Sequence, residues 1–379
     1  MRILIGSAHP YLPQMFGGAQ SSTHELVLHL RARGHEVGVL AGLTGEGWIG
    51  LRGRLALKLG RRGYVRDDAL GYPVFRAWFA WEAAQRVARD FGAEVAVFQS
   101  RLPVRLAEAV DRKALRTFIY LRNVERDDLG GEPGALSDTG FIANSQFTAR
   151  RFAESDGLSA PVIYPLVDRD RYRVESSATN VTFINPHPRK GLDVAVAMAR
   201  RFPEIPFAFV RSWALGPEEE AALQQSLVGL DNVTLRPSTR DMKSVYREAR
   251  IVLAPSRWEE AFGRIAAEAQ VSGIPVVGSD RGGLPEAIGP GGAVVPAEAS
   301  MEAWAEALGT LWHDEAAYAQ AAQAALDHAA RPEMNPERQI DRLVEVLGSR
   351  PGEKRPSTGG HAGRTDGAIP LDPPRHRAL

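Results

Sequence analysis

The stretch between residues 251 and 278 constrains the fold more than any other part of the chain. It begins with a short apolar run, IVLA at 251–254, which ends in Pro-Ser and is typical of a buried parallel strand that leads into a loop. A helix is predicted from Gly263 to Gly273, because apolar residues recur there at helical spacing and a glycine followed by Pro275 ends the pattern. The next run, PVVG, predicts another strand. The stretch therefore predicts a strand, a polar loop, a helix and a second strand, as in an α/β sheet.

The loop in this stretch has the properties of an anion site, since the first turn of a helix offers free N–H groups and the positive end of the helix dipole. Two carboxylates flank it, Glu260 and Glu268. If both lay on the helix, their spacing would separate them by about 12 Å, whereas the paired carboxyls of a glycoside hydrolase lie about 5–9.5 Å apart. Staggered carboxylates are better placed to hydrogen-bond hydroxyl groups at two points of one ligand. The loop thus indicates a site for a sugar and a ribose joined by a diphosphate.

Strands alternate with helices in both halves of the chain. In the first half, a strand at 3–5 is followed by Gly17-Gly18, a helix at 21–33 and a strand at 36–40. In the second half five strands are predicted with helical stretches between them: 181–184, 207–210, 233–235, 251–253 and 276–277. This order implies parallel sheets with right-handed crossovers. We therefore predict an α/β protein in which two Rossmann-like domains face each other across a cleft, with ligands beyond the carboxyl ends of the strands.

We place the N-terminal domain at 1–165 and the C-terminal domain at 166–330, and we expect domain closure to hinge near 161–174. A last helix at 331–348 has one apolar stripe, formed by Ile340, Leu343, Val344 and Leu347, and is expected to pack back on the domains. Residues 351–379 contain many glycines and prolines and almost no aliphatic residues, so a disordered tail is expected there.

The two glutamates and their neighbours resemble a known family. The strings P-S-x-x-E-E-x-F-G at 255–263 and G-G-x-P-E at 282–286 surround an E-x7-E pair, as in the retaining GT-B glycosyltransferases of family 4, the glycosyl transferases group 1. The resemblance implies a metal-independent glycosyltransferase, expected to be a hexosyltransferase, that uses a nucleotide-diphosphate sugar and retains the anomeric configuration. It further implies that Glu260 holds the donor sugar and Glu268 the ribose. The residues whose backbone would face the sugar and phosphates are Ala261, Phe262 and Gly263.

Two more motifs agree with the resemblance. Gly17 and Gly18 match the family's glycine loop, where a side chain would block the approach of the backbone to the donor. Lys190-Gly191 matches the family's phosphate loop, in which the lysine neutralises the leaving diphosphate. Relatives often have an arginine five residues before this lysine, where this chain has Asn185. Arg189 either takes the place of that arginine or is a solvated loop residue.

The N-terminal domain departs from the family's pattern. Many relatives have a histidine near the reacting sugar, after a strand that corresponds here to 117–121, but this strand ends in Arg122-Asn123. His9 is the histidine placed to reach the cleft from this side, although an isolated loop histidine is more often structural. The D-x-D string at 168–170 falls in the segment that resembles the family's interdomain connection, so we interpret it as a solvated turn. With no cysteine and no other cluster at ligand spacing, we predict no metal site.

Composition limits the partners. Lys plus Arg and Asp plus Glu are 46 each, so no net field favours nucleic acid. The start lacks the pattern of a signal peptide, and no run approaches the roughly 18 apolar residues of a spanning helix, which predicts a cytoplasmic protein. The stretch 48–66 is unusual in having six cations and no acid, with leucines at helical spacing and several glycines. It predicts either a basic amphipathic helix that contacts an anionic membrane face, which would suit a lipid-linked acceptor, or a mobile surface excursion.

Three functions are compatible with these residues. The leading one is a retaining glycosyltransferase, and the others are a GT-B sugar-nucleotide epimerase and a binding-only member without turnover. We expect no cofactor; the nucleotide-diphosphate sugar is a substrate, with a UDP-sugar slightly favoured. The loop at 235–241 follows a C-domain strand and is the candidate contact for the base, but nothing in it selects uracil over guanine. The acceptor is expected to be a sugar, a lipid-linked compound or another small molecule.

Overall fold

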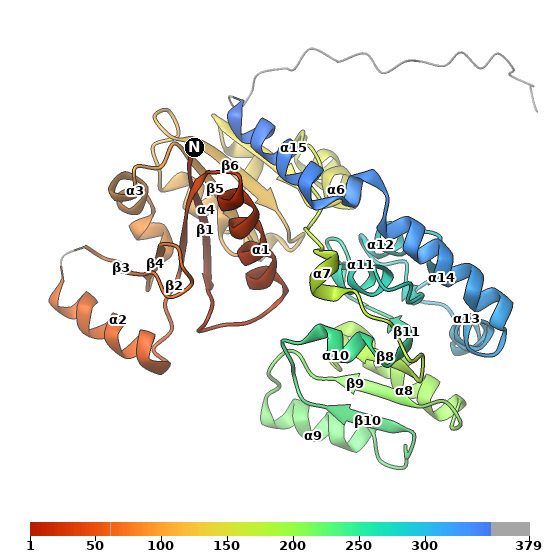
Figure 1. Ribbon diagram of the computed structural model, residues 1–379. Coiled ribbons are helices and arrows are strands. Elements are labelled where there is room, and N and C mark those ends of the chain that lie inside the picture. Colours follow the sequence, from red (N-terminus) through yellow and green to blue (C-terminus); the bar gives the residue numbers. More distant parts are fainter. Residues whose placement is uncertain (61, 350–379) are drawn as a thin grey trace, which may run out of the picture.

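The computed structural model describes residues 1–60 and 62–349, which form two lobes, each built on its own β-sheet (Figure 1). The N-terminal sheet has seven strands in the order β3-β4-β2-β1-β5-β6-β7. Its neighbouring strands pair in parallel except β3, which is antiparallel to β4 at one edge. The strands are β1 (Arg2–Pro10), β2 (Glu36–Gly42), β3 (Val65–Asp67), β4 (Val74–Ala77), β5 (Val95–Gln99), β6 (Arg116–Leu121) and β7 (Thr139–Ala143). The helices are α1 (Gly18–Ala32), α2 (Gly47–Leu59), α3 (Ala80–Phe91), α4 (Pro103–Glu108), α5 (Arg126–Leu129), the 3-10 helix η1 (Pro133–Ala135) and α6 (Gln146–Asp156).

The C-terminal sheet has six parallel strands in the order β10-β9-β8-β11-β12-β13. These are β8 (Asn180–Ile184), β9 (Phe207–Val210), β10 (Val233–Arg236), β11 (Ala249–Ala254), β12 (Val276–Ser279) and β13 (Gly292–Val295). The helices are α7 (Arg169–Tyr172), η2 (Pro188–Lys190), α8 (Leu192–Arg201), α9 (Pro217–Ser226), α10 (Met242–Tyr246), α11 (Arg264–Gln270), α12 (Leu284–Ile288), α13 (Met301–His313), α14 (Glu315–Ala329), η3 (Pro332–Met334) and α15 (Pro336–Gly348).

Each sheet separates two hydrophobic clusters, so helices cover both of its faces. In the N-terminal domain Leu4 and Leu40 belong to one cluster, whereas Ile3, Ile5 and Val39 belong to the other. Successive side chains of a strand point to opposite faces, and a strand with both faces covered is therefore apolar throughout. The predicted α/β fold with two Rossmann-like domains is confirmed. The strands β3, β4, β5, β7 and β13 were not predicted. Apolar runs of four or five residues, as in β4, β5, β7 and β13, do not differ in periodicity from pieces of buried helix, and β3 has only three residues, VRD, with no apolar run.

The connection between the domains contributes to both cores. Ile163 and Leu166 pack in a cluster of the N-terminal domain, whereas Val162, Tyr164 and Val167 pack in a cluster of the C-terminal domain. In an extended segment, side chains alternate between two sides, which lets a few consecutive residues join two cores. This segment lies within the predicted hinge region.

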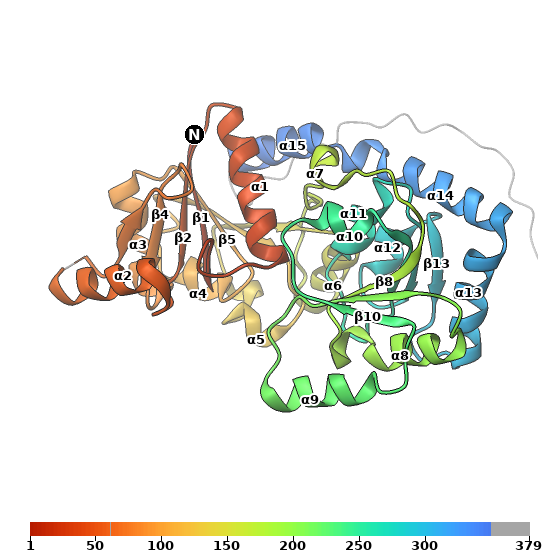
Figure 2. The ribbon, with the colours of Figure 1, turned by 60° about the horizontal axis from the view of Figure 1, so that its bottom comes forward.

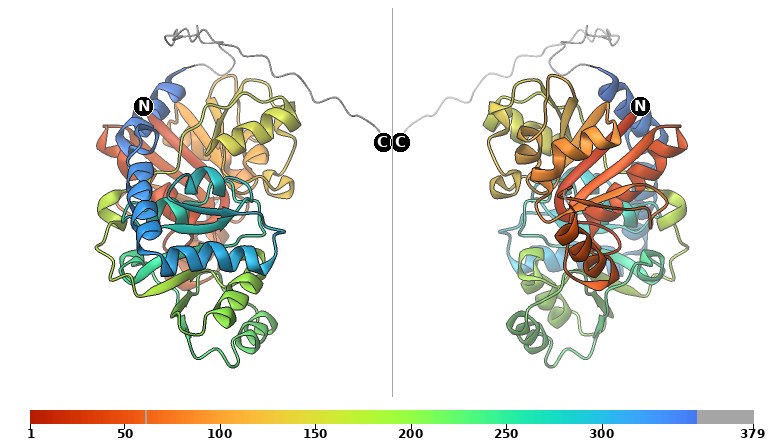
Figure 3. Two further views of the ribbon diagram at one scale, coloured as in Figure 1. Left: turned by 90° about the vertical axis from the view of Figure 1, so that its right-hand side faces the viewer. Right: turned by 90° about the vertical axis from the view of Figure 1, so that its left-hand side faces the viewer.

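The last helix, α15, returns to the N-terminal domain. Ile340 and Leu343 belong to the cluster that contains Ile3 of β1, and Arg116 of β6 donates hydrogen bonds of 3.0 Å to the last two carbonyls of the helix. Both views in Figure 3 place this helix, in blue, beside the start of the chain. The predicted disordered tail at 351–379 lies outside the described residues.

The basic stretch forms a helix at the outer edge of the N-terminal domain. α2 begins at Gly47 and ends at Leu59, on the side of that domain away from the C-terminal domain (Figures 1 and 2). Arg61, one of the six cations of this stretch, is not among the described residues. No helix in the described part of the chain is both long enough and apolar enough to cross a bilayer.

Candidate active site

Two loops of the C-terminal domain meet at the carboxyl ends of the adjacent strands β8 and β11. One carries Lys190 and the other carries Glu260, and the lysine Nζ donates a hydrogen bond to Oε1 of the glutamate. Ser256 donates to the same oxygen at 3.1 Å. The side chains of Lys190 and Glu260 are each about one-fifth exposed, so a ligand can reach them although neighbouring residues cover most of their surface. The structure therefore brings the two predicted catalytic residues into direct contact.

The backbone holds the two loops together. Arg257 and Trp258 each donate an N–H hydrogen bond of 3.0 Å to the carbonyl of Arg189. Gly191 has a φ of 82°, and a Cβ at this position would lie 2.0 Å from the carbonyl oxygen of Pro255. Only glycine permits both this left-handed conformation and this approach. The glycine of the Lys-Gly motif is thus required for the lysine to reach the glutamate loop.

Two tryptophans that sequence reasoning missed lie beside the cations of this site. The Nζ of Lys190 lies 5.1 Å from the ring centre of Trp213, and the guanidinium carbon of Arg189 lies 4.7 Å from that of Trp258. The two indole rings are 6.4 Å apart. An ammonium or guanidinium group over an indole is stabilised by the ring's negative face. Trp258 stands inside the motif itself, and Trp213 lies just after the predicted strand at 207–210, so a search for aromatic residues in the loops after the strands would have found both.

Asn185, which stands where relatives often have an arginine, has a structural role. It is buried, its φ is 66°, and its Oδ1 accepts a hydrogen bond of 3.2 Å from the backbone N–H of Trp213. Asparagine tolerates the left-handed conformation better than other residues with a side chain. Asn185 thereby helps to position Trp213, whereas Arg189 supplies a cation next to Lys190. That Arg189 contacts the phosphates stays a prediction.

The loop after Glu260 is hydrogen-bonded to the N-terminal domain. The carbonyl of Ala261 accepts hydrogen bonds from Ser145 at 2.5 Å and Thr148 at 3.0 Å, both at the start of α6. Phe262 is buried, with its ring 5.5 Å from that of Tyr164. Gly263 has a φ of 104° and leads directly into α11. These three residues were predicted to face the donor through their backbone. The structure adds that one of their carbonyls is already engaged by the N-terminal domain.

Glu268 lies on α11 in a buried network rather than at the surface. Its Oε2 accepts a hydrogen bond of 3.0 Å from Tyr246, and its Oε1 accepts one of 2.6 Å from Arg264. Burial raises the pKa of the Glu268 carboxyl above its usual range, although Arg264 opposes the shift. Each carboxylate oxygen can still accept a second hydrogen bond, so contact with a ribose stays a prediction.

Arg264 joins this network to the other domain. Its Nη2 lies 2.9 Å from Glu25 of α1, and it also donates to Tyr172 and to the carbonyl of Leu166. Figure 2 shows α1 facing α11 where the two lobes meet. Burial by itself would lower the pKa of Arg264, but the carboxylates of Glu268 and Glu25 outweigh it and raise that pKa. The guanidinium of Arg264 therefore stays charged. It links Glu268, the residue predicted to bind the ribose, to the N-terminal domain.

The glycine loop of the N-terminal domain leads into α1. Gly17 precedes the helix and Gly18 is its first residue. A Cβ at Gly18 would meet no atom within 4 Å, so packing within the protein does not require glycine there. The neighbouring 235–241 loop crosses from the other domain, with the guanidinium carbon of Arg240 3.3 Å from the ring centre of Phe16. The loop predicted to meet the base thus contacts the glycine loop.

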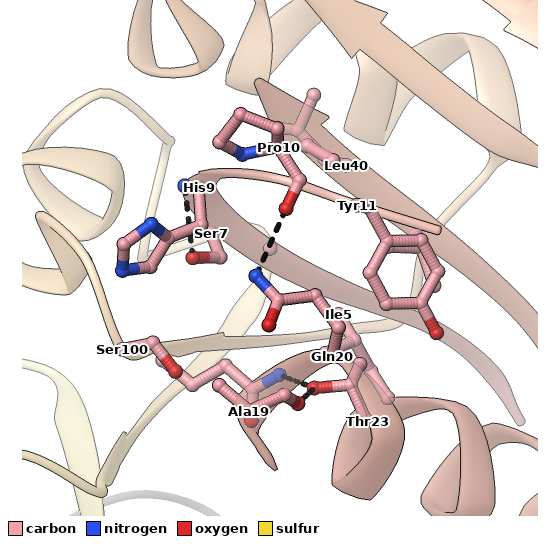
Figure 4. Close-up of a pocket in the computed structure, with 14 residues that line it drawn as sticks. Ile5, Ser7, His9, Pro10, Tyr11, Ala19, Gln20, Thr23, Leu40 and Ser100 are labelled. Carbon is pink, nitrogen blue, oxygen red and sulfur yellow. Dashed lines mark hydrogen bonds between the residues drawn. The ribbon is translucent and has the colours of Figure 1, made fainter. Parts of the chain in front are cut away.

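A small hollow lies at the carboxyl end of β1, beside the segment that leads from β1 to Gly17 (Figure 4). Its volume is about 20 Å³, and its walls include Ser7, His9 and Ser100. Gln20 of α1 donates a hydrogen bond of 3.1 Å to the carbonyl of Pro10 and so ties the loop to the helix. Figure 4 shows the imidazole of His9 at the edge of the hollow. A space of this size holds about one water molecule, which makes it part of the cleft wall rather than a separate ligand site.

The N-terminal side of the cleft contains titratable groups that sequence reasoning only partly found. Burial lowers the pKa of His9, and the nearby Arg101 lowers it further. Burial raises the pKa of Glu125, and the carboxylates of Asp128 and Glu260 add to this shift. Glu125, in the loop after β6, thus interacts electrostatically with Glu260 of the other domain. No local motif marks it.

Arg122 and Asn123 hold this side of the cleft in place. Arg122 donates hydrogen bonds to Gln99 at 2.9 Å and to Ser22 of α1, and burial lowers its pKa. Asn123 donates to Asp128 at 2.9 Å. Their side chains are thus engaged within the N-terminal domain, at the position where the resemblance led us to expect a histidine as in many relatives.

The D-x-D string forms the start of α7. Asp168 caps this short helix and accepts a hydrogen bond of 2.9 Å from the N–H of Asp170. Among residues 1–60 and 62–349, no group of three His, Asp or Glu side chains is arranged to hold a metal ion.

Comparisons with known proteins agree with this geometry. Residues 179–314 match the family model described as glycosyl transferases group 1. The chain is 40% identical over 197 residues to a D-inositol 3-phosphate glycosyltransferase of Mycobacteroides abscessus, which covers 46% of this chain and 44% of that protein. It is 36% identical over 215 residues to the enzyme of the same name from Mycolicibacterium gilvum, which covers 50% of this chain and 48% of that protein. The matched region thus spans about half the length of these curated relatives or less.

Solved structures share the fold over most of the chain. Anabaena Alr3699/HepE in complex with UDP-glucose has a TM-score of 0.72 and 19% identity, and the match covers 92% of this chain and 100% of that one. WaaG, a glycosyltransferase involved in lipopolysaccharide biosynthesis, has a TM-score of 0.67 and 16% identity, with 91% and 99% covered. Residues 179–314 therefore match the glycosyl transferases group 1 family, and the chain has the GT-B fold.

Proposed function

We propose that this protein transfers a sugar from a nucleotide-diphosphate sugar to a hydroxyl-bearing acceptor, without a metal ion and with retention at the anomeric carbon. The observation that carries the proposal is the contact between Lys190 and Glu260 where the β8 and β11 loops meet. The ammonium suits the diphosphate half of such a donor, and the carboxylate suits the hydroxyl groups of its sugar half. In the proposed reaction the acceptor oxygen bonds to the anomeric carbon, the bond from that carbon to the diphosphate breaks, and the hydroxyl proton is released.

The resting ion pair has a role in this proposal. In the proposed mechanism, donor binding redirects the Lys190 ammonium from Glu260 to the diphosphate and frees the carboxylate for the sugar hydroxyls. Ser256 and the ring of Trp213 hold the two groups in place meanwhile. Such preorganised charge needs little rearrangement when negative charge develops on the leaving diphosphate.

The donor base and the acceptor are proposed by analogy. HepE was solved with UDP-glucose, which supports a UDP-sugar donor, and the matched relatives are named for D-inositol 3-phosphate, which supports an acceptor that bears a phosphate. Arg101 would supply a cation and the neutral imidazole of His9 a hydrogen-bond donor for such a group.

The epimerase is not favoured, because the matching family model and the named relatives are glycosyltransferases. A binding-only protein would share the site but not the turnover. Hydrolysis or transfer of a donor sugar separates the transferase from the binding-only protein, and the identity of the released sugar separates it from the epimerase.

A thermal-shift panel of nucleoside diphosphates and their sugars, with EDTA present, tests the donor site. A ligand at 100 times its dissociation constant should add about 2.7 kcal/mol to stability. We expect one nucleotide to stabilise the protein clearly, a Lys190→Ala variant to lose most of this effect, and the exposed-site control Lys113→Gln to keep it. Stabilisation by none of the nucleotides, or equal stabilisation of all three proteins, would refute the proposed donor site.

A further inference from the structure

The helix α2 packs on the protein through its glycines and exposes its large apolar side chains, unlike an ordinary surface helix. Its buried residues are Gly50 and Gly53, and a Cβ at Gly50 would lie 2.5 Å from the backbone of Gly45. Its large apolar residues point to solvent: Trp48 is 75% exposed, Leu51 60%, Leu55 61% and Leu59 78%. Surface helices of globular proteins normally bury such a stripe. The glycines allow α2 to lie close to the domain with its apolar face turned outward.

Cations border the apolar face. At 100° per residue, Trp48, Leu51, Leu55 and Leu59 form one stripe, and Arg52 and Lys58 lie on its two sides. Both cations are exposed, and no salt bridge in the described part of the chain engages either of them. These six residues are called the α2 patch below. An apolar stripe with bordering cations fits the boundary between lipid headgroups and acyl chains of an anionic bilayer.

Neighbouring residues extend the same surface. Trp78 and Phe79, in the loop after β4, are exposed, and Arg54 of α2 has its guanidinium carbon 6.0 Å from the ring centre of Trp78. Aromatic rings are enriched at membrane interfaces. The right-hand view of Figure 3 faces this outer side of the N-terminal domain, away from the C-terminal domain.

We propose that the α2 patch docks this protein on an anionic lipid bilayer, with the apolar stripe inserted at the level of the headgroups. The opposite charges of the patch and of such a surface select the bilayer over a second copy of this chain, whose own patch would be equally cationic. The proposal is independent of the proposed transferase activity, because it concerns a surface outside the donor site.

The segment just before α2 is hydrogen-bonded to the loop that leads to Gly17 and Gly18. Gln14, in the loop that leads to the donor glycines, donates hydrogen bonds to the carbonyls of Thr44 at 3.1 Å and Glu46 at 3.2 Å, just before α2 begins. Docking would therefore hold the acceptor domain near the bilayer. An acceptor with a lipid anchor is implied by this only if the proposed function holds.

Sedimentation with vesicles tests the docking. We expect vesicles of phosphatidylglycerol and phosphatidylcholine to bind the full chain at low ionic strength, with much weaker binding at high salt and to pure phosphatidylcholine. Each cation near such a surface contributes about a fivefold factor, so Arg52→Gln/Lys58→Gln should bind about 25-fold more weakly. Leu51→Gln/Leu55→Gln/Leu59→Gln should lose about 100-fold or more, since buried apolar area drives insertion.

Matched controls change exposed residues elsewhere. Lys113→Gln/Arg338→Gln and Leu28→Gln/Val228→Gln should bind vesicles like the wild type, and all variants should unfold at the same temperature because the replaced side chains are exposed. Lipids brominated in the acyl chain should quench tryptophan emission, and Trp48→Phe should reduce the quenching. The proposal is overturned by absent binding at low salt, by equal binding of the leucine variant and its control, or by a leucine variant that changes only the association state in sedimentation equilibrium.

Discussion

Replacing Arg264 with methionine tests how much the buried network between the domains contributes to the stability of the protein. The arginine lies between Glu25 and Glu268, whose side chains are 6% and 7% exposed. Without Arg264, Glu25 keeps Arg171, which is more exposed, and the hydroxyl of Tyr172 as partners. Glu268 keeps only the hydroxyl of Tyr246. Removing one member of a buried ion pair typically costs about 3–5 kcal/mol. For a cooperative unit of about 150–250 residues this lowers Tm by about 6–20 °C.

The loss should depend on pH in a defined direction. Burial already raises the pKa of the Glu268 carboxyl, and removing the neighbouring guanidinium raises it further. The folded variant then favours the protonated carboxyl more than the unfolded chain does, so its stability is retained below the unfolded pKa of about 4.3 and is lost as the pH rises through the folded pKa. The deficit of the variant relative to the wild type should therefore be larger at pH 7 than at pH 5.

Thermal unfolding followed by circular dichroism at both pH values measures this difference. Arg33 offers a matched control, because it also lies between two carboxylates, Glu337 and Asp341, but those are well exposed. Arg33→Met should change the stability little, because exposed ion pairs are screened by solvent. Adding Glu268→Gln to Arg264→Met should restore part of the lost stability. A change in Tm no larger than that of the control, or an equal deficit at both pH values, would refute the network as described.

Three further predictions concern the donor site. Lys190→Ala should lower kcat by about 10²- to 10³-fold, as for the loss of one preorganised donor worth about 3–4 kcal/mol, and an unchanged steady-state rate would contradict its role. Glu268→Gln should raise KM for the donor whereas Glu260→Gln should mainly lower kcat, because the first is proposed to bind ribose throughout the reaction and the second the reacting sugar; equal effects on KM with kcat intact would contradict these roles. Gly191→Ala should destabilise the protein by about 1–3 kcal/mol, because its Cβ would lie 2.0 Å from the carbonyl oxygen of Pro255, and a Tm equal to that of the wild type would show that the loops are not packed in this way.

The sequence singled out Lys190 and Glu260 because each lies in a short string at the end of a predicted strand, and their roles in binding and catalysis stay predictions. Lys190 and Glu260 were assigned separately, and parallel strands β8 and β11 bring their loops together at one sheet edge. The two Rossmann-like domains could be predicted because strands and helices alternate throughout. The direct lysine–glutamate contact could not, since spacing along the chain does not give distances between loops.

The contacts between the domains were beyond sequence reasoning. Arg264 and Glu25 are 239 residues apart, and no pattern connects them. The electrostatic interaction between Glu125 and Glu260 likewise joins the two domains and has no local sequence pattern. Glu268 illustrates the same limit, because the motif that identifies it says nothing of the tyrosine and arginine that occupy its oxygens.

The central claim, that this chain breaks the bond between a sugar and a nucleoside diphosphate at the Lys190–Glu260 site without a metal, can be tested by proton NMR. The protein would be incubated with UDP-glucose, and with the other nucleotide sugars of the panel, in the presence of EDTA, with an acceptor bearing a phosphate and with water alone. We predict release of the nucleoside diphosphate together with a sugar product that first appears with the anomeric configuration of the donor, and loss of this signal in Lys190→Ala. An inverted product, an epimerised nucleotide sugar, or turnover only after a divalent metal is restored would contradict the account.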